Sequence, residues 1–261
     1  MIEVCDLQKS FGTHKILDGV SFSIDRGESV VIIGRSGGGK SVLLKHLIAL
    51  LKPDAGSVLI EGENIVPMTE RQLLRVRRKF GMLFQGAALF DSMTVAENIA
   101  FAFRRDQTLL EAEIERKVAH VLELVDLPGI QKKNPSELSG GMRKRVSLAR
   151  MIAYGAETAL LDEPFAALDA QLKLAMHDLL LQLAAENKQT VIFVTHDLME
   201  AVTLADRVIV CTRRPAMIAL EQKISLARPR DVLNVRFTNQ FKEHYDALWD
   251  RLRIEYQEER V

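Results

Sequence analysis

A glycine-rich segment, Gly34-Arg-Ser-Gly-Gly-Gly-Lys-Ser41, has the residue types and spacing needed to bind phosphate groups. It fits the pattern Gly-x-x-x-x-Gly-Lys-Ser/Thr at every fixed position, and such loops turn backbone amides inward around phosphate oxygens. Lys40 is expected to reach the β- and γ-phosphates, and the Ser41 hydroxyl to hold Mg²⁺. A plain glycine turn between a strand and a helix is the alternative, but the flanking residues favour the phosphate loop.

An acidic pair follows a second apolar segment. Thr158–Leu161 has the apolar character of a buried strand and runs directly into Asp162 and Glu163. We expect Asp162 to hold Mg²⁺ through water and Glu163 to polarise an attacking water as a general base. An acidic surface turn is the alternative interpretation, which the phosphate loop makes the weaker one.

A histidine and a glutamine follow two further strand-like segments. His196 comes directly after Thr190–Thr195. Gln85 comes directly after Phe80–Phe84, at the end of that predicted strand. Ligands of open α/β sheets bind at the carboxyl ends of parallel strands. His196 is therefore placed to hydrogen-bond a γ-phosphate, and Gln85 to bind Mg²⁺ or the attacking water. A lone histidine is more often structural, but its position at a strand end favours the functional interpretation.

A second glycine turn, Leu138-Ser-Gly-Gly-Met142, precedes a helix predicted over Arg143–Tyr154. Ser139 is a typical N-cap residue, and a glycine turn at a helix N-terminus makes a second anion site. One nucleotide does not need two such sites from one compact chain, whereas two copies arranged head to tail would use both. Taken alone, a helix cap with a tight turn would explain the same residues.

The elements that must position these side chains alternate between strand-like and helix-like patterns. This alternation predicts a mainly parallel sheet covered by helices. The helix after the phosphate loop carries an apolar stripe, Leu44, Leu47, Ile48 and Leu51. Further strands are predicted over Ile2–Leu7, Val20–Ile24, Val30–Ile33, Ser57–Glu61 and Arg207–Cys211.

A helical subdomain is predicted over residues 86–155, because the strand pattern stops after Gln85. Thr94–Glu97 is a capping box that opens a helix, and a helical apolar stripe runs from Leu110 to Val125. We therefore divide the chain into a main domain over residues 1–220, with its core at 1–85 and 156–220, and a C-terminal extension over 221–261.

The extension ends in a predicted amphipathic helix with the stripe Phe241, Tyr245, Leu248, Trp249, Leu252 and Tyr256. We expect this stripe to pack back on the main domain, and a subunit interface is the alternative. Five positive charges over Arg71–Lys79 are expected to lie on a solvated helix face or loop rather than to bind phosphate.

Composition limits the class of protein. The 261 residues are 48% hydrophobic, enough for a large core, and 35 basic residues balance 35 acidic ones, which gives no electrostatic footprint for nucleic acid. No apolar run approaches the ~18 residues of a membrane-spanning helix, and the first residues do not have the pattern of a signal peptide. Cys5 and Cys211 are expected to be small core residues in a reducing compartment.

In this order, the motifs resemble those of the nucleotide-binding subunits of ATP-binding cassette (ABC) transporters. The correspondence runs nearly from end to end: Walker A at Gly34–Ser41, the Q-loop at Gln85, the signature at Leu138–Met142, Walker B ending at Asp162, then Glu163, the D-loop Ala167–Asp169 and the switch His196. The resemblance implies an α/β P-loop NTPase with a RecA-like, mainly parallel core, an antiparallel β subdomain and an inserted helical subdomain.

The resemblance also implies ATP and Mg²⁺ as cofactors, and it assigns roles to residues. Lys40, Gln85, Glu163 and His196 would be catalytic, and Ser41, Gln85 and Asp162 would hold the metal. Phe11 occupies the position of an aromatic residue that stacks on adenine. The remaining nucleotide contacts would come from Gly34, Arg35, Ser36, Gly37, Gly38, Gly39, Val42 and Asp169, with Ser139, Gly140 and Gly141 of a second copy closing the site in trans.

The partners implied are a second copy of the chain in a head-to-tail homodimer, integral-membrane permease subunits, and an accessory substrate-binding or MCE-type protein. The subunit would be peripheral, on the cytoplasmic face of the inner membrane. Two positions depart from the family pattern, because Met142 replaces a glutamine and Ala166 a serine or glycine. Neither change removes a phosphate-contacting group, so we expect ATPase activity to be retained.

Two branches of the family are resembled in different parts of the chain. Gly81–Phe101 is similar to Mla/Mce-type cassettes, which serve phospholipid trafficking, whereas the segments from Asp162 to Trp249 are more similar to nitrate, sulfonate and taurine uptake cassettes. We favour the phospholipid branch, because a membrane partner would dock near the Q-loop. A soluble ABC protein acting on ribosomes or DNA and a small-molecule kinase are the other hypotheses, and the kinase leaves the turn at Ser139–Gly141 without a role.

Overall fold

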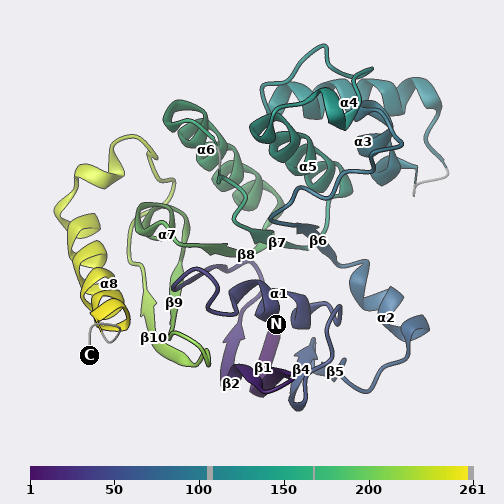
Figure 1. The fold of residues 1–261 in the computed structure, drawn as a ribbon. Helices are drawn as coiled ribbons and strands as arrows, with labels where there is room; N and C mark the ends of the chain where they lie inside the picture. Colours follow the sequence, from purple (N-terminus) through teal and green to yellow (C-terminus); the bar gives the residue numbers. More distant parts are fainter. Residues whose placement is uncertain (105–107, 167, 258–261) are drawn as a thin grey trace.

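The fold is organised around two β-sheets, a smaller one with strands between residues 2 and 64 and a larger one with strands between residues 29 and 223 (Figure 1). The computed structural model describes residues 1–104, 108–166 and 168–257. The smaller sheet is antiparallel, with the order β2-β1-β4-β5, and its strands are β1 (Ile2–Phe11), β2 (His14–Ile24), β4 (Ala55–Ile60) and β5 (Glu63–Asn64).

The larger sheet has the order β10-β9-β3-β8-β7-β6, and all its neighbouring strands are parallel except the antiparallel pair β10 and β9. Its strands are β3 (Ser29–Ile33), β6 (Phe80–Leu83), β7 (Thr158–Asp162), β8 (Thr190–Thr195), β9 (Arg207–Cys211) and β10 (Ile218–Lys223). Strand β10 had no sequence prediction and crosses the expected boundary at residue 220. We therefore propose that the main domain extends through Lys223.

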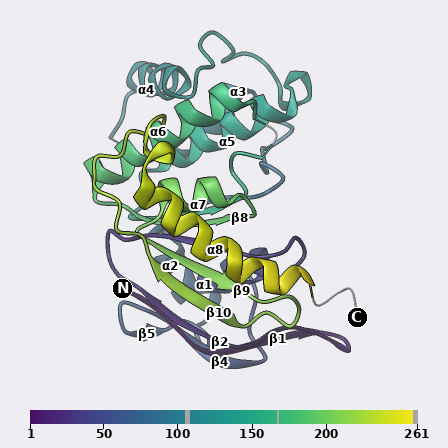
Figure 2. The ribbon, with the colours of Figure 1, turned by 90° about the vertical axis from the view of Figure 1, so that its left-hand side faces the viewer.

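Some helices form a separate lobe, and others cover the two faces of the larger sheet. Helices α3, α4 and α5 make up a lobe at one end of the larger sheet, beyond β6 and β7 (Figures 1 and 2). The helices are α1 (Lys40–Leu47), α2 (Glu70–Arg77), α3 (Val95–Phe103), α4 (Glu111–Leu124), α5 (Gly140–Tyr154), α6 (Ala170–Asn187), α7 (Leu198–Leu204) and α8 (Asn239–Gln257). None of the helices in these described ranges is both long and apolar enough to cross a membrane.

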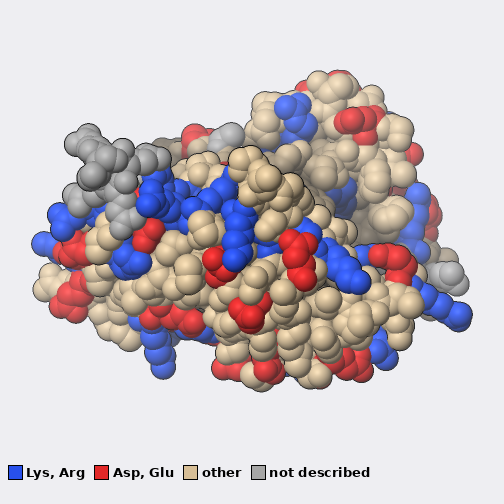
Figure 3. Space-filling model, turned by 60° about the horizontal axis from the view of Figure 1, so that its bottom comes forward, with Lys and Arg blue, Asp and Glu red and all other residues tan. Residues whose placement is uncertain are grey.

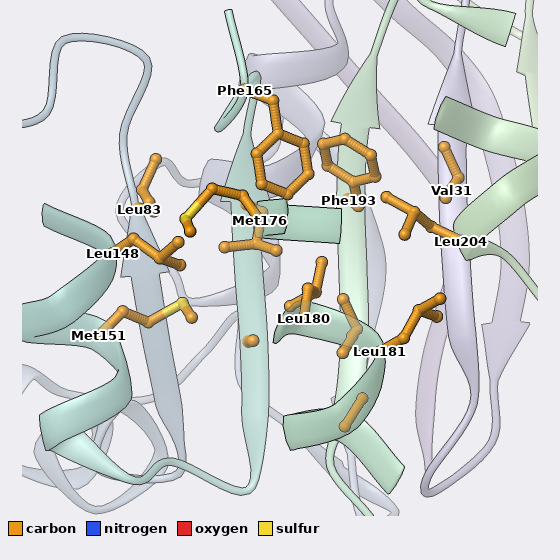
Figure 4. Close-up of a cluster of buried hydrophobic side chains, with 14 of the residues drawn as sticks. Val31, Leu83, Leu148, Met151, Phe165, Met176, Leu180, Leu181, Phe193 and Leu204 are labelled. Carbon is orange, nitrogen blue, oxygen red and sulfur yellow. The ribbon is translucent and has the colours of Figure 1, made fainter. Parts of the chain in front are cut away.

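The larger sheet is buried on both faces, as a parallel sheet must be. Along β8, Val191 and Phe193 belong to one apolar cluster, and Ile192 and Val194 belong to the other. The first cluster includes α6, where Met176 and Leu180 lie near Phe165 and Phe193 (Figure 4). The second includes α1 and the antiparallel sheet. The ends of the central strands are therefore held rigidly, which is what a precise site at those ends requires.

Local sequence signals for the helix starts are confirmed. The Thr94 hydroxyl accepts from the Glu97 amide at 3.3 Å, and the Glu97 carboxylate accepts from the Thr94 amide at 2.7 Å, so the predicted capping box forms. Ser139 caps α5 in the predicted way, with Oγ accepting from the Met142 amide at 3.2 Å. The basic segment Arg71–Lys79 forms most of α2, whose arginines pair with acidic side chains on the surface.

The C-terminal helix packs back on the main domain, as expected. Phe241, Leu248 and Leu252 are buried, and α8 contacts α7, β9 and β10. Trp249 was predicted to share this stripe but is 48% exposed, because it lies about 100° around the helix from Leu248. The side chain of Tyr256 lies outside the described residues.

The prediction for the two cysteines is half wrong. Cys211 is buried at the end of β9, whereas Cys5 is exposed. Along the start of β1, Ile2 and Val4 face the core, so the next residue, Cys5, faces outward by the two-residue period of a strand.

On the surface, lysine and arginine are interspersed with aspartate and glutamate, as the face in Figure 3 shows.

Candidate functional site: a phosphate loop beside three strand ends

The phosphate loop connects β3 to α1 and depends on glycine at specific positions. Gly37 and Gly39 have φ values of 74° and 98°, which side-chain-bearing residues adopt only with strain. At Gly34 a Cβ atom would lie 2.9 Å from the carbonyl oxygen of Cys211, so the loop also passes too close to β9 for a side chain. Gly39 is the N-cap of α1, and the loop therefore leads directly into a helix N-terminus that favours anions.

Lys40 is held inside the loop by the loop's own carbonyl groups. Its Nζ donates hydrogen bonds of 2.7 Å to the backbone oxygens of Gly34 and Arg35, and the residue is only 5% exposed. Burial lowers the pKa of the Lys40 ammonium, and nearby Asp162 and Glu163 oppose that shift. The ammonium is thus presented to the space that the loop encloses.

Ser41 and Asp162 bring two oxygen donors together from different elements. The Ser41 hydroxyl, on the first turn of α1, donates to Asp162 Oδ1 at 2.9 Å at the end of β7. Asp162 is 3% exposed, and burial raises the pKa of its carboxyl, whereas the Ser41 hydrogen bond lowers it. Hydroxyl and carboxylate oxygens are suitable ligands for Mg²⁺.

Glu163 lies between the other two predicted residues. Its Oε2 accepts a hydrogen bond from Gln85 Nε2 at 3.3 Å, and its Oε1 lies 3.4 Å from His196 Nδ1. These residues follow β6, β7 and β8, which are neighbours in the sheet. The predicted convergence of Lys40, Ser41, Asp162, Glu163, Gln85 and His196 at one edge of the sheet is therefore present in the structure.

Lys144 is a residue of this region that the sequence interpretation missed. It is 8% exposed on α5, and its Nζ donates to the backbone oxygens of Phe84 at 3.3 Å and Glu163 at 3.2 Å. Burial lowers the pKa of its ammonium. The hydrogen bonds tie the ends of β6 and β7 to the helical lobe. The available signal was a lysine in helical register with the buried Ser147 and Met151.

The signature turn does not join this cluster within one chain. Ser139 and Gly140 are exposed at the start of α5, and Gly141 is partly exposed. Figure 1 places α5 in the helical lobe, whereas α1 lies against the larger sheet. A second chain is therefore required if these residues are to meet a nucleotide held by the phosphate loop.

The other predicted contacts are exposed or partly exposed and come from several elements. Phe11 is 47% exposed at the end of β1, with Lys9 Nζ 5.5 Å from its ring centre. Asp169 is exposed and caps α6 by accepting from the Leu172 amide at 3.0 Å. Ser36 is exposed in the loop, and the backbone oxygen of Val42 lies 2.7 Å from His46 Nδ1. Ala167 of the D-loop lies outside the described residues.

An apolar groove of about 370 Å³ lies beside Gln85, between β6, α3 and α5. Phe90 and Phe101 line it with ring centres 5.6 Å apart, and the Arg150 guanidinium lies 5.6 Å from the Phe90 ring. Both phenylalanines are exposed, at 44% and 59%. A groove with exposed aromatic walls is typical of a protein-interaction surface.

Comparison with known proteins agrees with this geometry. The family description "ABC transporter" matches residues 17–166. The chain is 43% identical over 205 residues to a "probable ribonucleotide transport ATP-binding protein mkl" of Mycobacterium leprae, covering 78% of this chain and 59% of the relative. It is 44% identical over 211 residues to a "sulfate/thiosulfate import ATP-binding protein CysA" of Bordetella parapertussis, covering 80% and 58%. The chain thus spans about three-fifths of the length of these relatives.

Solved structures show the same fold. A dimeric post-hydrolysis state of the ATP-binding cassette MJ0796, bound to ADP and Pi, superposes with a TM-score of 0.80 at 29% identity, covering 87% of this chain and all of the other. A second dimeric structure of that bacterial cassette gives a TM-score of 0.81 at 30% identity. Members of the ABC transporter family hydrolyse ATP. The chain belongs to this family and has the fold of its ATP-binding cassettes.

Proposed function

We propose that this chain is the ATP-hydrolysing subunit of a membrane transporter. The observation that carries the proposal is the position of Glu163 at the end of β7, in contact with Gln85 and near His196 and the phosphate loop. In this proposal, Lys40 and the loop amides bind the phosphates, and Glu163 takes a proton from the attacking water. His196 hydrogen-bonds the γ-phosphate, and Gln85 orients the water beside Glu163.

The residues present fit a magnesium ion. Ser41 and Asp162 offer two oxygens from adjacent groups, and no cluster of three or more histidine, cysteine, aspartate or glutamate ligands occurs among the described residues. Mg²⁺ commonly binds through one or two protein oxygens together with phosphates and water, so a full protein cage is unnecessary. When bound with ATP, Mg²⁺ would neutralise charge on the β- and γ-phosphates. Gln85 would be a further ligand.

We propose that two copies associate head to tail. Ser139, Gly140 and Gly141 are exposed at a helix N-terminus and have no nucleotide to contact within their own chain. The dimeric structures of the MJ0796 cassette support this arrangement. Each nucleotide would then be bound by the phosphate loop of one protomer and closed by the signature turn of its partner.

We propose that the apolar groove beside Gln85 receives a permease subunit. The groove and the hydrolytic site share the segment after β6. Phe84 lines the groove, and the next residue, Gln85, belongs to the hydrolytic site. Movement of Gln85 with nucleotide state would therefore change the shape of the groove. In this proposal the chain is peripheral, at the cytoplasmic face of the inner membrane, and an accessory substrate-binding or MCE-type protein is a further component of the transporter.

The cargo we propose is phospholipid, because the segment similar to Mla/Mce-type cassettes, Gly81–Phe101, supplies most of the groove. Uptake of a small oxyanion is the second candidate. The 44% identity to a relative described as a sulfate/thiosulfate import protein favours it.

Photo-crosslinking in membranes of the source cells tests the partner and its class. A photoreactive amino acid replaces Phe101 in the groove, and the control replaces Phe237, an exposed aromatic residue before α8. We expect the Phe101 probe alone to capture a polytopic membrane protein, whose identification by mass spectrometry distinguishes a lipid permease from an anion permease. Equal capture by both probes, or none from position 101, would contradict the proposed docking groove.

A further inference from the structure

A polar cluster is buried directly behind His196, where α6 and α7 meet the end of β8. Thr195, Glu200 and His177 are 2%, 4% and 5% exposed, within otherwise apolar surroundings. Lys173 and Asp197 border the same cluster and are partly exposed. Burying a carboxylate is costly unless it is paired and hydrogen-bonded, so this arrangement calls for a physical role.

The cluster is a chain of short contacts that begins at α6. Lys173 Nζ, one turn into α6, lies 3.0 Å from Glu200 Oε1 and 3.4 Å from Asp197 Oδ2. Glu200 Oε2 accepts a 2.6 Å hydrogen bond from the Thr195 hydroxyl, which itself accepts from the Asp197 amide at 3.0 Å. Of the two residues that flank His196, Thr195 is therefore bonded to Glu200 and Asp197 is paired with Lys173.

Lys173 supplies the ammonium that faces both carboxylates of the cluster. Burial by itself would raise the pKa of the Glu200 carboxyl, but hydrogen bonding to its neighbours outweighs burial, and the pKa is lowered. The neighbours that lower it are His177, whose Nε2 lies 3.8 Å from Glu200 Oε1, the Thr195 hydroxyl and the Lys173 ammonium. Without the ammonium, Glu200 and Asp197 would be two neighbouring carboxylates, and Glu200 would keep only the Thr195 hydroxyl and the His177 imidazole at 3.8 Å among these contacts.

Among the described residues, the link from this cluster to His196 runs through its two chain neighbours, Thr195 and Asp197. Phe165 separates it from the Glu163 side, with its ring 4.6 Å from that of His177 and 5.5 Å from that of Phe193. Apolar packing thus fixes one side of the His196 segment, and the polar cluster fixes the other.

We propose that Lys173 is a positioning residue for His196. Through Glu200 and Asp197 it holds the backbone on both sides of His196, so that the imidazole points at Glu163 and at the γ-phosphate position. The inference rests on the proposed ATP hydrolysis. It adds that the helix beginning after Asp169, which carries Lys173, sets the position of the switch histidine.

The test is a double-mutant cycle measured as ATP turnover of the purified chain. Lys173→Met keeps the apolar part of the side chain and removes the charge. We expect it to lower kcat about tenfold, with ATP affinity changed less than about twofold. Lys79→Met is the matched control, because Lys79 pairs with Glu61 at the antiparallel sheet, away from the site. Lys173→Arg can still reach both carboxylates and should retain at least about half of the turnover.

The His196→Ala background separates positioning from general stability. If Lys173 acts through His196, adding Lys173→Met to His196→Ala should lower kcat by less than about twofold. A full tenfold further loss would overturn the proposal, as would unchanged turnover in Lys173→Met alone. Thr195→Val, which has the same shape as threonine, removes only the hydroxyl contacts and should reproduce the loss even if Lys173→Met folds poorly.

Failure of the proposed function is distinguishable in the same experiment. If the wild-type chain does not hydrolyse ATP, or if His196→Ala has no effect on kcat, the assigned hydrolytic site is wrong. If both behave as proposed and the cycle is additive, only the role of Lys173 is wrong.

Discussion

Replacing Glu163 by glutamine tests the proposed general base with little change of shape. Its carboxylate accepts from Gln85 Nε2 at 3.3 Å and lies 3.4 Å from His196 Nδ1. A glutamine has the same length, and its amide oxygen can accept from Gln85 while its NH₂ group faces the imidazole. The backbone hydrogen bond from the Glu163 amide to the Val194 oxygen at 3.0 Å is not affected. We therefore expect the fold and the surrounding contacts to be retained.

The expected loss follows from the chemistry removed. General-base catalysis contributes about 10²- to 10⁴-fold, so kcat should fall by that factor, or roughly 2.7 to 5.4 kcal/mol in the activation free energy. ATP binding depends on Lys40 and the loop amides, so the dissociation constant should change less than about threefold. Because ATP binds but is not hydrolysed, the Glu163→Gln chain should accumulate as a closed dimer.

Three measurements check this prediction: phosphate release, fluorescent-nucleotide binding, and light scattering after size-exclusion chromatography with saturating ATP. Glu157→Gln is the matched control, because Glu157 lies just before β7 and forms a surface ion pair with Arg26 at 2.5 Å. Surface pairs contribute little, so its turnover should stay within about twofold of the wild type. If Glu163→Gln retained more than about a tenth of wild-type turnover, Glu163 could not be the general base.

Three further predictions concern the same site. Lys40→Ala should weaken ATP binding at least about tenfold, because a charge-assisted phosphate contact is lost, and unchanged affinity by fluorescence titration would contradict its role. Ser139→Arg should abolish hydrolysis while each chain still binds ATP, and mixing it with Lys40→Ala chains should restore part of the turnover if sites are shared in trans. Asp162→Asn should raise the thermal unfolding temperature without nucleotide or Mg²⁺ at neutral pH. Burial raises the folded-state pKa of Asp162, so the folded chain binds a proton more readily, and wild-type stability falls as pH rises from the usual aspartate pKa to the raised one. The Asn variant does not titrate, so its advantage should disappear at acidic pH, and an advantage that persists there would refute the assignment.

Local signals predicted most of the elements, because their causes are local. The apolar run Thr190–Thr195 is a strand with the predicted bounds. The N-cap residues Thr94 and Ser139 start their helices because a side-chain oxygen satisfies an amide that has no partner within the helix. Strand β10 was missed, because its partly exposed residues alternate weakly and its pairing with β9 is set by a turn after Cys211.

The candidate site was predicted from position along the chain, and its contacts required the tertiary structure. A parallel sheet places all carboxyl ends at one edge, so Gln85, Glu163 and His196 could be expected to meet there. No sequence rule predicts that Lys144 reaches across from the helical lobe to the Phe84 and Glu163 carbonyls. That contact depends on how the helical lobe and the main domain are packed against each other.

The sequence by itself determined the phosphate loop, the order of the motifs and the parallel core, because glycine spacing, capping residues and apolar periodicity act over a few residues. Only the tertiary structure decided which side chains are buried and which meet. Cys5 faces outward, Trp249 lies off the buried stripe, and Lys173, Glu200 and Thr195 form one chain of contacts behind His196. Whether a side chain is buried or paired depends on segments that are distant in the sequence and meet only in the folded chain. The free energy of a charged side chain depends on those same surroundings.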